Sequence, residues 1–193
     1  MTGGRPPQVR CIVVECDLEA VALRAFLDCA TRADVTLRGV ATSYQLTDEL
    51  RAAGRDADYV VVTCHGDEDG IIFEELAPGV LTPDQPCEAR VGPKQIRSRV
   101  HLSGQPVICT GCGQGTEAMA EAFVGAGSSH YIAAAGDPEG WAAPLLLTLL
   151  FHELLVARRP VPEAMQRATA YDDELRLFHL WSAGQVPQSR RTT

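Results

Sequence analysis

The sequence predicts a three-layer α/β/α sandwich built around a mainly parallel sheet. Two observations carry this prediction: apolar, β-rich runs alternate along the chain with helical patterns, and four of these runs are continuously hydrophobic. Continuous Val/Ile runs are typical of strands that are buried on both faces of a sheet. The four runs cover residues 11–14, 59–63, 107–109 and 131–134, and a fifth, more alternating run covers residues 35–41.

The helical segments lie between and after these runs. Apolar periodicity predicts helices over residues 18–30, 46–53 and 117–124, and a further helix is expected over 93–100, after a long loop at 78–92. The last fifty residues predict helices over 142–158 and 162–180. In the first helix, the predicted buried stripe consists of Leu18, Val21, Ala22, Ala25 and Cys29.

One domain accounts for the whole chain of 193 residues. We expect it to cover residues 10–182, between a flexible N-terminus at 1–9 and a flexible tail at 183–193. The net charge of −8 disfavours nucleic acid and anionic membrane surfaces as partners. The longest apolar run, residues 141–151, is too short to span a bilayer, and no signal-peptide core precedes the domain. We therefore expect a cytoplasmic protein whose seven cysteines are reduced thiols.

Reactive side chains follow two of the predicted buried strands. His65 and Gly66 come directly after the run at 59–63, and Cys112 follows the run at 107–109 within Gly111-Cys112-Gly113. Ligands of parallel α/β sheets bind at the carboxyl ends of the strands, so neighbouring strands would bring the imidazole and the thiol to one edge. An imidazole can hold a thiol as thiolate or take its proton, which makes the sulfur a nucleophile.

An apolar strand ending in His-Gly, followed by an apolar strand ending in Cys, resembles the caspase-like (clan CD) cysteine peptidases. The separation of 47 residues between His65 and Cys112 is close to the roughly 50 residues quoted for caspases. The closest subgroup looks like the CHAT domains. Residues 118–127 are similar to the helix after the nucleophile, and residues 149–168 are similar to a CHAT segment in which one helix ends and another begins.

The resemblance implies a cysteine endopeptidase with a His65/Cys112 dyad and no cofactor. The amides of Gly66 and Cys112 would hold the oxyanion. Carboxylates line the substrate pocket in family members that cut after Arg or Lys, and Asp17 and Asp137 follow strands at the same predicted edge. Thr110 holds a position that borders this pocket in relatives. Asp17 also suits a helix N-cap, and Asp137 also suits a turn.

The expected partner is a protein or peptide substrate, with an activating partner chain or self-association as a further expectation. The main alternative from another class is a caspase-like module that binds partners without catalysis. Three weaker alternatives use the same residues: a zinc site of Cys64, His65, Cys109 and Cys112; a redox pair of Cys109 and Cys112; and a hydrolase triad of Cys112, Asp172 and His179. The acidic run 67–69 reads as a solvated turn or as a cation site.

Overall fold

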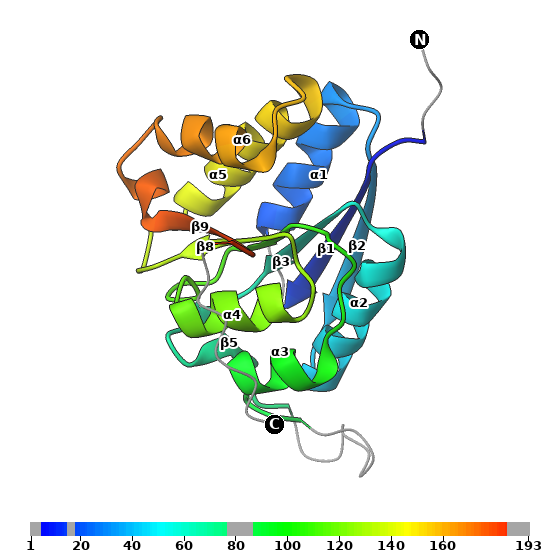
Figure 1. The fold of residues 1–193 in the computed structure, drawn as a ribbon, viewed down its shortest axis with the longest axis vertical. Helices are drawn as coiled ribbons and strands as arrows, with labels where there is room; N and C mark the ends of the chain where they lie inside the picture. Colours follow the sequence, from blue (N-terminus) through cyan, green and yellow to red (C-terminus); the bar gives the residue numbers. More distant parts are fainter. Residues whose placement is uncertain (1–4, 15–17, 77–86, 185–193) are drawn as a thin grey trace.

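The computed structural model describes residues 5–14, 18–76 and 87–184, and places a six-stranded sheet between two layers of helices (Figure 1). The strand order is β2-β1-β3-β7-β8-β9. Five strands are parallel and the edge strand β9 runs antiparallel to β8. The strands are β1 (Gln8–Val14), β2 (Asp34–Val40), β3 (Tyr59–Thr63), β7 (Val107–Cys109), β8 (His130–Ala134) and β9 (Phe178–Ser182). The predicted fold class is confirmed.

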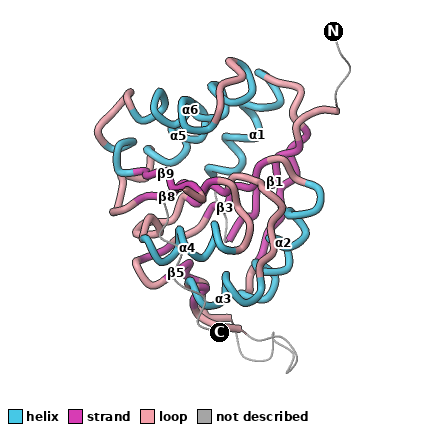
Figure 2. Tube along the Cα trace, in the orientation of Figure 1, coloured by secondary structure: helices cyan, strands magenta, loops and turns pink. Residues whose placement is uncertain are grey.

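Helices cover both faces of this sheet. They are α1 (Leu18–Ala30), α2 (Ser43–Asp56), α3 (Pro93–Arg99), α4 (Glu117–Gly125), α5 (Ala142–Phe151) and α6 (Val161–Thr169). Helices α1, α5 and α6 lie on one side of the magenta strands in Figure 2, and α2, α3 and α4 lie on the other. Two buried apolar clusters fill the spaces between the sheet and these layers. The strands β3, β7 and β8 are almost wholly buried, which explains why their sequences are continuously apolar.

The chain changes direction within the sheet between β1 and β3. It leaves β1 for the edge strand β2 and then returns through α2 to β3 on the other side of β1. Strands β7 and β8 continue outward from there. In open α/β sheets such a switch point opens a crevice at the carboxyl ends of the strands. The residues that follow β3 and β7 lie at this edge.

A second, small antiparallel sheet was not predicted. It consists of β4 (Gly66–Asp67), β5 (Gly70–Ile72) and β6 (Arg90–Val91). Residues 78–86 of the predicted long loop lie outside the described residues, but the end of that loop forms β6. The small sheet starts directly after His65, so it supports one side of the edge that carries the predicted dyad.

The predicted helix over 162–180 is wrong beyond residue 169. Helix α6 ends at Thr169, a 3-10 turn follows at Glu174–Leu177, and Phe178–Ser182 is strand β9. Phe178 of this strand is buried and His179 is exposed, and Leu180 and Trp181 follow. This short β-like pattern was not distinguished from a continuing helix in the prediction. The predicted helix over 142–158 is interrupted as well, because α5 passes into a π-helical turn at His152–Val156.

The buried face of α1 also differs from the prediction. Ala20, Leu23 and Leu27 face the core, whereas the predicted stripe is exposed to solvent; its members are Leu18, Val21, Ala22, Ala25 and Cys29. At the N-terminus, residues 8 and 9 fall in the segment expected to be flexible but belong to β1. Among the described residues, no helix has the length and apolar character needed to cross a bilayer.

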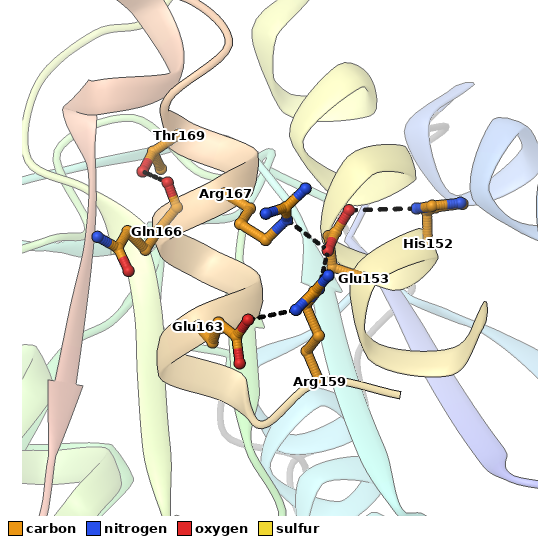
Figure 3. A network of polar contacts seen from close by, with 7 residues as sticks. All are labelled: His152, Glu153, Arg159, Glu163, Gln166, Arg167 and Thr169. Carbon is orange, nitrogen blue, oxygen red and sulfur yellow. Dashed lines mark hydrogen bonds and ion pairs between the residues drawn. The ribbon is translucent and has the colours of Figure 1, made fainter. Parts of the chain in front are cut away.

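A carboxylate joins the π-helical turn to α6. Glu153 accepts hydrogen bonds from Nε of Arg159 at 2.7 Å and Nε of Arg167 at 3.0 Å, and Arg159 also pairs with Glu163 (Figure 3). Desolvation raises the pKa of Glu153, but the charge of Arg167 and the contacts of Arg159 and His152 outweigh it, so the pKa is lowered overall. The ionised carboxylate therefore stabilises this corner.

We expect Glu153→Gln to lower the melting temperature at neutral pH. Because the folded-state pKa is lowered, the stabilisation is present above the unfolded-state value of about 4.3 and is lost as the pH falls through the lower folded-state value. Thermal unfolding followed by circular dichroism should show a difference from wild type that narrows below about pH 4. Asp48→Asn, which breaks one exposed ion pair with Arg51, is the control. An equal difference at all pH values would contradict this account.

Candidate active site

The pairing of β3 with β7 places His65 and Cys112 at equivalent positions. Each residue of β7 pairs with a residue of β3 that lies 47 positions earlier, as in the pair Val62 and Cys109. The N–H of Thr110 donates to the carbonyl oxygen of Val62 at 3.0 Å and carries the ladder one step further. Since His65 and Cys112 are also 47 residues apart, they leave two neighbouring strands in the same register and at the same edge.

The two loops that follow these strands are in direct contact. A Cβ atom added to Gly66 would lie 2.7 Å from Nε2 of Gln114 and 3.0 Å from the carbonyl oxygen of Cys112, so glycine suits this close approach. Gly113 has φ +64°, and a Cβ there would lie 2.9 Å from the backbone of Asp67. The glycines beside the dyad thus let the histidine loop and the nucleophile loop meet.

Both dyad residues are accessible. The His65 side chain is exposed, and its carbonyl oxygen accepts a hydrogen bond at 3.0 Å from the N–H of Ile72 in the small sheet. Cys112 is half-buried. The thiol that was predicted to react is therefore open to a substrate, unlike Cys64 and Cys109, which are buried.

Burial and negative charge keep the Cys112 thiol protonated. Burial raises its pKa above the ordinary value, and the nearby carboxylates of Asp137 and Glu19 raise it further, while the amide of Cys112 itself lowers it. A thiolate that is poised at neutral pH in the free protein, as a simple reading of the dyad suggests, does not fit these surroundings. The sulfur needs a base or an added positive charge before it can react.

Glu19 is a residue of the site that the sequence reasoning missed. It lies in the first turn of α1, just after the carboxyl end of β1, and its charge acts on Cys112. The predicted carboxylates, Asp17 and Asp137, both follow predicted strands, and Asp17 lies outside the described residues. The signal that could have identified Glu19 is its place in the first turn of a helix that begins at the active edge.

Two threonine hydroxyls lie side by side beneath this edge. Alternation along β3 and β7 puts Thr63 and Thr110 on the face of Val61 and Ile108, which pack toward the layer of α1 and α5. Thr63 is fully buried and Thr110 is 5% exposed. Within the described ranges, neither hydroxyl has a hydrogen-bond partner. Buried hydroxyls usually have a hydrogen-bond partner, so these two are exceptions at the edge that carries the predicted dyad.

The remaining predicted site residues are Asp137 and the two amides of the expected oxyanion hole. Asp137 is exposed in the loop between β8 and α5, and its electrostatic effect on Cys112 puts it near the thiol. The amide of Cys112 is close to its own sulfur, since it lowers the thiol pKa. The assignment of the Gly66 and Cys112 amides to an oxyanion hole stays a prediction.

The structure places the residues of the redox, zinc and hydrolase-triad alternatives as follows. The thiols of Cys64 and Cys109 contact each other at 3.6 Å inside the core, and Cys109 is not the exposed first cysteine of a redox pair. The described residues contain no group of three His, Cys, Asp or Glu side chains that could hold a metal ion. His179 lies on the edge strand β9, with its ring beside Trp181.

The acidic run after the histidine is an ion-paired turn. Arg90 of β6 pairs with Asp67 at 2.5 Å and with Asp69 at 3.2 Å. The N–H of Asp69 also donates to Oδ1 of Asp67. A groove of about 430 Å³ between α6 and β9 is lined by His179 of the alternative hydrolase triad, but not by the residues predicted for the dyad, the oxyanion hole or the substrate pocket.

The chain resembles known proteins in its fold but not in its sequence. No family model matches the chain, and no curated protein matches it. The structure is similar to the Arg-specific cysteine proteinase gingipain R, with a TM-score of 0.61 at 14% identity over 93% of this chain. It is also similar to separase in the Saccharomyces cerevisiae separase–securin complex, with a TM-score of 0.56 at 11% identity over 93% of this chain.

The chain spans 46% of the gingipain chain and 12% of the separase chain. At such low identities the similarity concerns the fold alone. This chain therefore has the α/β fold of caspase-like cysteine peptidases.

Proposed function

We propose that this chain is a cysteine endopeptidase that uses His65 and Cys112 to cleave peptide bonds after a basic residue. The shared register of β3 and β7 is the observation that carries the proposal, because it brings an imidazole and an accessible thiol to one glycine-lined edge. The fold similarity to two cysteine peptidases agrees with it. Within this fold we place the chain nearest to the CHAT-domain peptidases, on the sequence features given above.

The proposed reaction uses only groups of this chain, the substrate and water. His65 takes the proton of the Cys112 thiol as the sulfur attacks the scissile carbonyl carbon. The amides of Gly66 and Cys112 stabilise the negative oxygen of the tetrahedral intermediate. His65 then returns the proton to the leaving amine, the C–N bond breaks, and water hydrolyses the thioester to free the carboxylate and Cys112.

Specificity for Arg or Lys follows from the groups around the sulfur. Glu19 and Asp137 both act on Cys112 through their negative charges, and the hydroxyls of Thr63 and Thr110 offer acceptors beneath the same edge. A guanidinium carries five donors and suits such a set of acceptors. Its positive charge would also offset the two carboxylates and favour the thiolate of Cys112. Asp17 remains part of this proposal from its position in the sequence.

A caspase-like binding module without catalysis is the second candidate function. The raised pKa of Cys112 favours it, because the thiol of the free protein is protonated and needs activation. A partner chain or a second copy that orders the substrate loops would then be required for activity. The two candidate functions differ in whether a basic substrate alone switches the thiol on.

Hydrolysis of fluorogenic peptides ending in Arg, Lys or Asp tests the proposed activity. We expect turnover of the Arg and Lys peptides and none of the Asp peptide. Cys112→Ser and His65→Ala should each reduce kcat/KM by about 10³-fold or more, as for deletions in other nucleophile–base pairs. Cys29→Ser, which removes an exposed cysteine on α1, is the control and should keep full activity. Turnover of the Asp peptide alone, or activity that survives Cys112→Ser, would refute the proposal.

Asp137→Asn should have opposite effects on two measurements. Removing this negative charge lowers the pKa of Cys112, so iodoacetamide should alkylate the thiol faster at neutral pH, and the rate should rise with pH from a lower onset than in wild type. Cleavage of the Arg peptide should fall by about 10- to 100-fold, the loss expected for one charge-assisted hydrogen bond.

Glu139→Gln is the matched control, since Glu139 is an exposed carboxylate in the same loop. Alkylation and cleavage should both stay close to wild type in this variant. If Asp137→Asn left cleavage of the Arg peptide unchanged, Asp137 would not belong to the pocket.

A further inference from the structure

Gln114 links the two loops of the proposed dyad through its side chain. It is fully buried, and its Nε2 donates a hydrogen bond to the backbone carbonyl oxygen of Asp67 at 2.6 Å. Its carboxamide also packs against Gly66, where an added Cβ would lie 2.7 Å from Nε2. A side chain of the nucleophile loop therefore holds the backbone of the histidine loop.

The backbone around Gln114 is anchored on the opposite side. The hydroxyl of Tyr131 in β8 donates to the carbonyl oxygen of Gln114 at 3.1 Å. The N–H groups of Gly113 and Gly115 donate to Gly136 at 2.9 Å and to Ala134 at 2.6 Å. The segment that follows Cys112 is thus fixed to β8 and its loop, while the Gln114 side chain reaches across to the loop after β3.

The sheet itself stops short of the dyad. Strand β7 ends at Cys109, and the last ladder hydrogen bond described above runs from Thr110 to Val62. His65 and Cys112 both lie beyond this point, where side-chain contacts must set the distance between the loops. The hydrogen bond from Gln114 to Asp67 spans this gap directly, and its donor belongs to a fully buried side chain, which limits competition from water.

We propose that Gln114 is a positioning residue that sets the separation of His65 and Cys112. Its carboxamide holds the two loops at a fixed separation. Without this contact, the imidazole of His65 would no longer lie within reach of the Cys112 sulfur. The inference rests on the proposed dyad, but only on the action of His65 on Cys112, and it requires neither a substrate nor turnover. Alkylation of Cys112 therefore tests it separately from peptidase activity.

The experiment compares Gln114→Met and Gln114→Glu with wild type, each with and without His65→Ala. Methionine keeps the length of the side chain and removes the donor, whereas glutamate sets a carboxylate oxygen against the carbonyl of Asp67. The rate of iodoacetamide alkylation at Cys112 is followed across pH by peptide mass spectrometry, which separates Cys112 from the exposed Cys29 and Cys87. Circular dichroism reports whether each variant is folded.

Gln105→Met is the matched control. Gln105 also donates from Nε2 to a backbone carbonyl, that of Gly54 at 3.1 Å, but it precedes β7 and so lies at the opposite edge of the sheet. Loss of this hydrogen bond should resemble loss of the Gln114 hydrogen bond in its effect on stability, without affecting the dyad.

We expect His65→Ala to slow alkylation of Cys112 by about 10-fold or more in wild type and in Gln105→Met. In the two Gln114 variants the same substitution should change the rate by no more than about twofold, because coupled residues give non-additive effects. Full His65 dependence in a folded Gln114 variant would overturn the positioning role while leaving the dyad intact. Absence of His65 dependence in wild type would overturn both the dyad and the positioning role.

Discussion

The parallel pairing of β3 with β7 is the constraint on which the candidate site depends. Its register brings the residues that follow the two strands to the same edge, so a histidine and a cysteine 47 residues apart leave the sheet side by side in sequence register. A shift of one position would turn each strand residue to the opposite face and separate these loops from their partners. Val60, Val62 and Val107 hold the register by packing into the core beneath α2, α3 and α4.

The groups around Cys112 differ between the two sides of the sheet. On the side of α1 and α5, Glu19 and the two threonine hydroxyls make the edge negative and polar. On the side of α4, the buried Tyr131 and Gln114 tie the loops together through backbone carbonyls. In the proposed function, the side of α1 and α5 would recognise the substrate, and the side of α4 would hold the two loops in place. Burial and the charges of Asp137 and Glu19 raise the pKa of the Cys112 thiol and so favour its protonated form.

Local sequence patterns predicted the fold well where burial is symmetric and poorly where it is not. The continuously apolar strands β3, β7 and β8 were recognised because both of their faces are buried. Strand β9 was read as helix because it lies at an edge, follows a true helix and carries only a short β pattern. The face of α1 was misassigned because apolar residues occur all around the helix, and only packing against α5 and the sheet selects Leu23 and Leu27.

The same distinction separates the site residues that sequence could predict from those that it could not. His65 and Cys112 follow recognisable strands and are flanked by glycines, so their shared edge follows from topology alone. Glu19 acts on Cys112 through space, and Thr63 presents a buried hydroxyl without a partner; both features depend on how a helix and a strand are packed. Gln114 illustrates the limit most clearly. Nothing in the local sequence singles it out, yet it is fully buried and reaches a carbonyl 47 residues earlier in the chain. Such a contact forms only when both loops are folded. For that reason, the distance between the imidazole and the sulfur depends on both loops together and cannot be predicted from either sequence segment alone.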